Sequence, residues 1–323
     1  MTPLSIRLDG DSLHLGEHLA VQFQRTLRIP DDGRTYPLPP GLGRFPIRRV
    51  EDYADRVPDA WRARGGVFLP MYQREAMWLS LRASWPPMAL KVGIGEVNAV
   101  SGKPWTHALD AEDQDYLVCP DQPWLDGINS GHGTIRQFVA MPLGMGYTVE
   151  GQLTGQESAG GVQLVAYEAR PDRLPERPDR AVDMLMACSA PAAEMGLGAG
   201  GQMTQEIYPD DYGIETWDFE RCGRVFVHIA NSMAWRGITG EEPPPTPVSS
   251  RTYTEHGFPW FSLYDERRGD VEPGQELERV KSIKEMDGAK GFAAQQDDGT
   301  VEIAQSQRVE LGRRGDLVGG GER

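Results

Sequence analysis

Short apolar runs separated by glycine and proline are the feature that most constrains this chain. Within residues 116–168, three such runs at 134–141, 147–153 and 162–167 are divided by Gly/Pro-rich connections. Runs of this length that end at turn residues are typical of β-strands. We therefore expect a mainly β fold, an antiparallel sandwich or meander of the β-rich α+β kind, with a few short helices and long Pro-rich loops.

The same patterns extend over the rest of the chain. Residues 4–29 alternate apolar and polar side chains around Asp-Gly and Gly-Glu turns, which predicts an antiparallel hairpin or meander. Strands are also expected at 90–100, 201–208 and 224–229, and a hairpin at 291–305. Helix signals occur at 50–64, where Pro58 limits the helix to a short piece, and at 71–81, 230–238 and 277–286.

The chain length fits one large or two ordinary domains, since a single core stops growing near ~250–300 residues and this chain has 323. The Pro-rich, charged segment 171–180 is the best candidate linker. It separates a β-rich half at 1–170 from a second β-rich half at 181–265, which either forms its own sheet or shares one with the first. Residues 266–323 are expected to form a C-terminal extension or arm.

Charge and cysteine content exclude several function classes. The chain is acidic, with 33 Lys and Arg against 48 Asp and Glu and a net charge of −15, so nucleic acid and membrane surfaces are not expected partners. Three cysteines without CxxC spacing favour reduced thiols, and the N-terminus lacks the apolar core of a secretory signal. The most apolar window, 181–201, contains Asp183, Pro191 and Glu194, so we expect no transmembrane segment and a cytoplasmic location.

A polar loop before the central strands holds the candidate catalytic residues. Cys119 and His132 have the side-chain types of a nucleophile and its base, and Asp121 and Asp126 lie between them. The pattern equally fits a buried thiol and a histidine in a turn.

Metal and cofactor motifs are weak. His14, Glu17 and His18 match H-x-x-E-H, a zinc-protease pattern that needs a helix, but Gly16 and the alternating flanks favour a hairpin. The acidic clusters at 110–115 and 210–218 lack calcium-loop spacing, and the glycines at 196–201 lack the Lys and Ser/Thr of a phosphate loop. We expect no metal and no cofactor.

The tryptophans supply a second kind of candidate site. Five of the eight, Trp105, Trp124, Trp217, Trp235 and Trp260, are candidates for lining a sugar or peptide groove. Large aromatic side chains also fill cores and subunit contacts, which is the alternative interpretation.

Several segments together carry a family resemblance. These are IYPDDYGIETWD, RVFVHIANSMAWRGITG, TPVSSRTYTEHGFPWFSLYDE, QRTLRIPDDGRTYPLPPGLGRFP, PDQPWLDGINSG and QFVAMPLGMGYTVEGQ. The chain resembles a family of uncharacterised bacterial and fungal proteins, some labelled automatically as integral membrane proteins. The resemblance implies no activity and no residue roles, and the hydropathy above disagrees with the membrane label.

Two kinds of function follow from the sequence. The first is a non-enzymatic β-rich protein that acts through self-assembly or as a scaffold or binding protein, with a second copy or another protein as partner. The alternatives are a Cys/His-dependent hydrolase and a protein that binds a small ligand such as a glycan.

Overall fold

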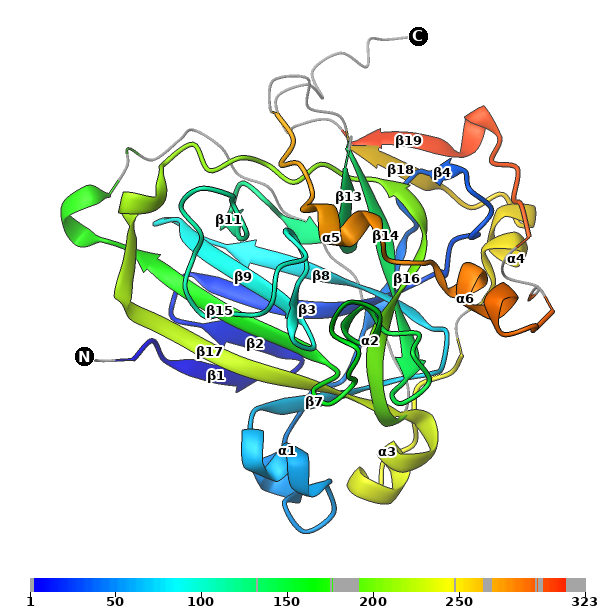
Figure 1. The fold of residues 1–323 in the computed structure, drawn as a ribbon, viewed down its shortest axis with the longest axis horizontal. Coiled ribbons are helices and arrows are strands. Elements are labelled where there is room, and N and C mark those ends of the chain that lie inside the picture. Colours follow the sequence, from blue (N-terminus) through cyan, green and yellow to red (C-terminus); the bar gives the residue numbers. More distant parts are fainter. Residues whose placement is uncertain are drawn as a thin grey trace, which may run out of the picture.

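Strands dominate the computed structural model, which describes residues 3–131, 133–174, 176, 192–246, 248–263, 269–293, 295 and 299–311. In this part of the chain, 17 strands join in one large, mainly antiparallel sheet and two more form a small parallel one (Figure 1). The expected mainly β fold with few short helices is confirmed.

The large sheet contains β1 (Ile6–Asp9), β2 (Ser12–Leu15), β3 (Leu19–Thr26), β4 (Thr35–Tyr36), β5 (Gly41–Arg44), β6 (Arg48–Arg49), β7 (Val67–Met71), β8 (Ala76–Ala83), β9 (Met88–Ile94), β10 (Val97–Asn98), β11 (Leu117–Cys119), β12 (Trp124–Leu125), β13 (Gly127–Gly131), β14 (Thr134–Pro142), β15 (Val162–Ala169), β16 (Ala192–Thr204) and β17 (Trp217–Asn231). The small sheet pairs β18 (Trp260–Leu263) with β19 (Arg308–Leu311). The helices are α1 (Asp59–Arg64), α2 (Val149–Thr154), α3 (Ser232–Thr239), α4 (Ser250–Glu255), α5 (Gln275–Glu278) and α6 (Ile283–Ala289).

The sheet folds into two layers around one core. In one layer, β3 pairs with β2 and β8; in the other, β15 pairs with β9 and β17. The long strands β14 and β16 connect the layers, because β14 pairs with β8 and β16 pairs with β17. Strands from both sides of segment 171–180 therefore share one sheet.

Period-two alternation explains which side chains meet in the core. On β3, Val21 and Phe23 are fully buried in the main cluster, and on β15 Leu164 faces the same cluster from the opposite layer. The C-terminal part also contributes, since Leu277 and Val280 belong to this cluster.

The short helices begin and end at residues suited to those positions. Pro58 lies directly before α1, and the helix is short, as the proline in segment 50–64 predicted. Ser282 caps α6 with a complete capping box. Figure 1 shows α1 and α3 together at one end of the molecule, where Trp61 and Trp235 both pack on Phe68. The short helix expected at 230–238 is confirmed as α3.

Two predictions of local structure before residue 170 were wrong. Residues 71–81, expected as a helix, contain the last residue of β7 and most of β8, which pairs with β3 along its whole length. Residues 147–153, expected as a strand, begin helix α2, because the Thr148 side chain accepts from Gly151 N and Gly155 ends the helix in the left-handed conformation.

The C-terminal region also differs from expectation. The helix expected at 277–286 is divided into α5 and α6. The described residues of 291–305 form no strand, so the hairpin expected there is wrong for that described part.

No helix among the described residues is long and apolar enough to cross a membrane.

Gly127 lies where β13 packs closely on β14, so a substitution at this residue tests that packing. A Cβ at this position would lie 1.9 Å from the carbonyl oxygen of Arg136. We expect Gly127→Ala to lower the free energy of unfolding by about 1–3 kcal/mol or more, because the two strands must separate. Equilibrium urea unfolding measures the change.

Gly237→Ala is the matched control. Gly237 lies in α3 with no atom within 4 Å of its added Cβ, so the substitution should raise stability by up to ~1 kcal/mol through helix propensity. If Gly127→Ala unfolded at the same urea concentration as the wild type, the close packing of β13 on β14 would be contradicted.

Candidate functional site

The outer face of β9, β15 and β17 forms the floor of a pocket. Residues paired across an antiparallel ladder point to the same side of the sheet. One cross-strand row holds Gly93, Gln163 and Phe226, and the next holds Lys91, Val165 and Arg224. Leu164 lies between Gln163 and Val165 and points inward to the core.

Two separate layers cover this outer face and leave the middle open. At one end, Trp61 of α1 stacks on His228 of β17, with ring centroids 4.7 Å apart. At the other end, the loop 102–116 packs Leu109 and Tyr116 against Val165 and its neighbours. The pocket is the gap between these two layers.

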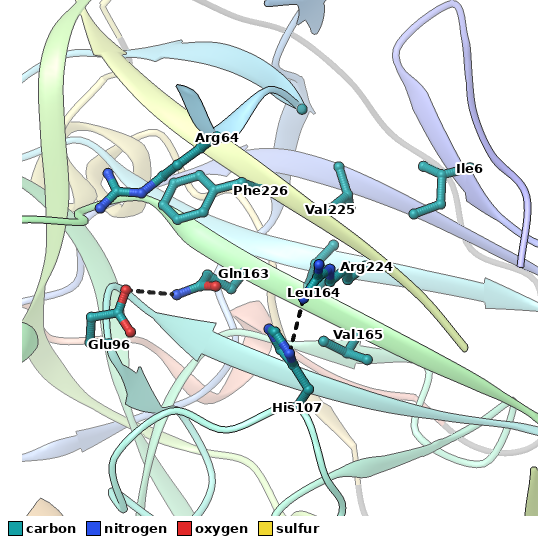
Figure 2. A pocket seen from close by; sticks show the side chains of 11 residues that line it. Ile6, Arg64, Glu96, His107, Gln163, Leu164, Val165, Arg224, Val225 and Phe226 are labelled. Carbon is teal, nitrogen blue, oxygen red and sulfur yellow. Dashed lines mark hydrogen bonds between the residues drawn. The ribbon is translucent and has the colours of Figure 1, made fainter. Parts of the chain in front are cut away.

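The pocket has a volume of about 430 Å³ and mixed polar and apolar walls. Its lining is Ile6, Arg64, Gly66, Glu96, His107, Gln163, Leu164, Val165, Arg224, Val225 and Phe226. Figure 2 shows Arg64 beside Phe226 on one side and His107 meeting Arg224 on the other. Glu96 accepts a hydrogen bond from Gln163 Nε2 at 3.3 Å.

His107 is held in one neutral tautomer. Arg224 Nη1 lies 3.2 Å from His107 Nδ1. A guanidinium only donates, so Nδ1 must accept, and the imidazole proton is on Nε2. Partial burial and the positive charges of Arg224 and Lys91 lower the pKa of His107. At neutral pH the ring therefore offers an N–H donor without a charge.

A buried lysine anchors the loop that carries His107. Lys91 is 1% exposed and its Nζ lies 2.5 Å from an oxygen of Asp115, at the end of the loop. Its ammonium also donates to the carbonyl of Ala108, and the Tyr167 hydroxyl donates to the carbonyl of His107. These bonds hold the loop 102–116, which carries His107, against β9 and β15.

A glycine allows the loop to lie this close to β9. A Cβ on Gly93 would lie 2.6 Å from the indole of Trp105. Trp105 packs there instead, under the ammonium of Lys91 at 5.8 Å and edge-on to His107. The absence of a side chain at Gly93 thus determines the position of the loop.

The lining favours an anion with an apolar body. It carries two guanidinium groups, Arg64 and Arg224, and one carboxylate, Glu96. Arg64 lies over the Phe226 ring, 5.3 Å from its centroid. Arg224 and the His107 Nε2–H supply donors at one side, while Val165 and Phe226 supply apolar surface.

The loop predicted to be catalytic is mostly buried. Cys119 is 0% exposed, and its thiol donates to the carbonyl of Gln122 at 3.7 Å. Burial, with a contribution from the charge of Asp121, raises the pKa of Cys119 far above its usual range. The thiol is protonated at neutral pH, which is the state of a structural cysteine and a poor nucleophile.

The other three candidates do not join Cys119 in a described cluster. Asp126 is buried and paired with Gln205, whose Nε2 donates to Asp126 Oδ2 at 2.8 Å. Asp121 is half-buried and accepts from the Tyr212 hydroxyl at 3.3 Å. His132 lies outside the described residues. Cys119 and Asp126 thus make their described hydrogen bonds to Gln122 and Gln205.

The five tryptophans proposed for a groove lie in separate places. Trp217 packs in the cluster below the loop 102–116, Trp235 packs beside α1, and Trp124 and Trp260 share a third cluster. These four are buried, and only Trp105 is partly exposed. A single groove lined by all five is therefore wrong.

The possible metal motifs have structural roles. His14 lies on β2 and His18 in the turn before β3, which confirms the hairpin. In the acidic clusters, Asp110 pairs with Lys103 at 2.7 Å, and Asp210 accepts from the Trp217 indole at 2.9 Å. Over the described ranges, no group of three or more His, Cys, Asp or Glu is placed to hold a metal ion.

Sequence reasoning missed the pocket residues. Arg64, Glu96, His107, Gln163 and Arg224 come from five separate segments, and none forms a motif. The one signal in the sequence was the alternation of side chains along β15 and β17. It places Gln163 and Arg224 on the face of the sheet that points away from the core.

Comparison with protein-family models, with curated proteins and with solved structures finds no match to this chain.

Asp126 makes stability depend on pH. Burial raises its pKa to about 7, above the ordinary value of 3.8. Between these values the folded protein keeps a proton that the unfolded chain has lost, so stability falls as pH rises, by about 1.4 kcal/mol per pH unit. Asp126→Asn removes this titration. From pH 4.5 to 6.5 the variant should gain about 3 kcal/mol relative to wild type.

Urea unfolding of both proteins at several pH values measures this difference. The contributions of the other titrating groups to stability are the same in both proteins and therefore cancel. A stability difference that is constant over this range would contradict a raised pKa at Asp126.

Proposed function

We propose that this chain is a non-enzymatic binding protein whose pocket on the outer face of β15 and β17 takes a small carboxylate with an apolar body. The observation that carries the proposal is the meeting of Arg224 and the neutral His107 beside the apolar surface of Val165 and Phe226. The described residues that line the pocket include no nucleophilic serine, threonine or cysteine.

The pocket chemistry supports a ligand rather than a reaction. A guanidinium has five N–H donors, and the bond to His107 uses one of them. The Nε2–H of His107 is positioned by that same bond. A carboxylate has two oxygens with four lone-pair sites, so it can accept from the remaining N–H donors of Arg224.

Benzoate is the probe for this proposal, with neutral benzamide as its comparison. Isothermal titration calorimetry should detect benzoate binding, and benzamide should bind at least about tenfold more weakly because a charge-assisted hydrogen bond contributes ~1.5–3 kcal/mol. Arg224→Ala should reduce benzoate affinity by a similar factor.

Arg221→Ala is the matched control on the same strand. Arg221 is exposed, pairs with Glu168 at 2.8 Å and lines a different cavity, so its removal should leave benzoate affinity unchanged. Equal binding of benzoate and benzamide, or equal loss in both arginine variants, would rule out carboxylate recognition by Arg224.

Self-assembly, a protein partner and a cytoplasmic location remain predictions from the sequence. The Pro-rich arms support assembly, and the three cysteines without CxxC spacing support a reducing compartment. The carboxylate pocket is compatible with each, because it lies within one chain.

A further inference from the structure

The pocket on the outer face of β9, β15 and β17 carries a carboxylate as well as its two arginines. Glu96 lines the pocket and is exposed, so a molecule from solvent can reach it. Its side chain accepts a hydrogen bond from Gln163 Nε2 at 3.3 Å (Figure 2). Because the donor is a neutral amide, this bond leaves the negative charge of Glu96 uncompensated. The pocket therefore has an anionic group in addition to its cationic ones.

A tight turn holds Glu96 in this position. Gly95 and Glu96 form the two-residue turn between β9 and β10. Gly95 is in the left-handed region at φ +56°, and a Cβ there would lie 2.4 Å from a carboxylate oxygen of Glu150. The Glu96 carbonyl accepts from Trp105 N at 2.9 Å, and the Gly95 carbonyl accepts from Gln163 Nε2 at 2.8 Å. These bonds attach the turn to both the loop 102–116 and β15.

The register of the sheet separates Glu96 from the arginine that binds the carboxylate. Glu96 contacts Gln163 in one cross-strand row, and Arg224 lies with Val165 in the next row. Residues two apart on a strand are separated by ~6.6 Å. Arg224 Nη1 reaches across its row to His107 Nδ1 at 3.2 Å, so its guanidinium lies over the sheet. A ligand that contacts Arg224 and Glu96 together must carry its charges several ångströms apart.

Apolar groups line the space between these two charges. Val165 and Phe226 belong to the pocket lining, and Arg64 covers the Phe226 ring on the β17 side. Arg64 donates to the carbonyl of Ser158 at 3.3 Å, which directs its guanidinium away from Glu96 on the β9 side. The volume of about 430 Å³ lies in the range of ligand pockets, ~300–1,000 Å³. A molecule with one six-membered ring fits this space.

We propose that the pocket binds a zwitterion, an amino carboxylate whose amine and carboxylate lie at opposite ends of an apolar body such as a benzene ring. This inference rests on the carboxylate pocket proposed above and adds a second recognised group. The carboxylate accepts from the remaining N–H donors of Arg224, and the ammonium donates to Glu96.

Charge also favours a zwitterion over a simple anion. The protein has a net charge of −15, which repels an anion but not a ligand without net charge. An α-amino acid is a poorer match, because it carries both charges on one carbon and cannot contact Arg224 and Glu96 across two rows of the sheet.

The test compares 4-(aminomethyl)benzoate with 4-ethylbenzoate, in which a methyl group replaces the ammonium. Isothermal titration calorimetry of the full chain at low salt should show about two- to fivefold tighter binding of the amine, the gain of one exposed ion pair. Glu96→Gln should abolish this preference by weakening the amine alone. 4-Ethylbenzoate should bind the variant at least as tightly as wild type, because a negative charge is lost. The affinity for L-phenylalanine should not depend on Glu96.

Glu220→Gln is the matched control, because it removes the same charge from an exposed position of β17 outside the pocket lining. The preference for the amine should persist in this variant. Equal affinities of the two benzoates for wild type, or an unchanged preference in Glu96→Gln, would overturn the zwitterion and leave carboxylate binding in place. An equal loss of L-phenylalanine binding in Glu96→Gln would contradict the spacing. Absence of binding by every carboxylate would overturn the proposed function, and the zwitterion with it.

Discussion

The pairing of β15 with both β9 and β17 determines which side chains meet at the outer pocket. Because side chains alternate between the two faces, this register places Gln163 and Val165 outward while Leu164 fills the core. A shift of one residue would exchange these sets and bury Arg224 in the core. Burial of Leu164 and Val225 therefore helps to fix the outward positions of Gln163, Val165 and Arg224.

Lys91 adds a second constraint on the same face. A buried ammonium is tolerated only when it is paired and hydrogen-bonded, and here Asp115 and the carbonyl of Ala108 meet that need. Both partners belong to the loop 102–116, so the bonds that satisfy the Lys91 ammonium also hold this loop in place. Burial and the charge of Arg224 lower the pKa of His107, and the charge of Lys91 adds to that effect. The ion pair thus holds the loop, and its lysine contributes to the neutral state of His107.

The sequence predicted much of the sheet but little of the pocket. Alternation identified the hairpins of 4–29 and the strands β9, β14 and β15, because a half-buried strand leaves a period-two pattern. It failed at β8, where Met77, Leu79 and Leu81 alternate toward the core but the flanking residues mimic helical spacing. Pairing with β3 outweighed the local preference.

For the candidate catalytic residues, the limit of the sequence is burial rather than local propensity. Cys119, Asp126 and His132 drew attention because reactive residue types lie close in sequence, but burial decides whether a thiol ionises, and sequence does not show burial. The pocket residues come from segments far apart in the chain, so only the folded sheet brings them together. The segment 116–132 stood out in the sequence because it contains several reactive residue types. Gln163 and Arg224 are residue types that many strands contain.

The net charge of −15 affects the outer pocket in two opposite ways. An anion that approaches the outer pocket meets the repulsion of the whole acidic protein and, at close range, the attraction of Arg64 and Arg224. Salt screens charges over ~8 Å at physiological ionic strength, so it weakens the distant repulsion more than the direct contact. At physiological salt, the local positive charge of Arg64 and Arg224 therefore governs whether the pocket attracts an anion, despite the acidic net charge.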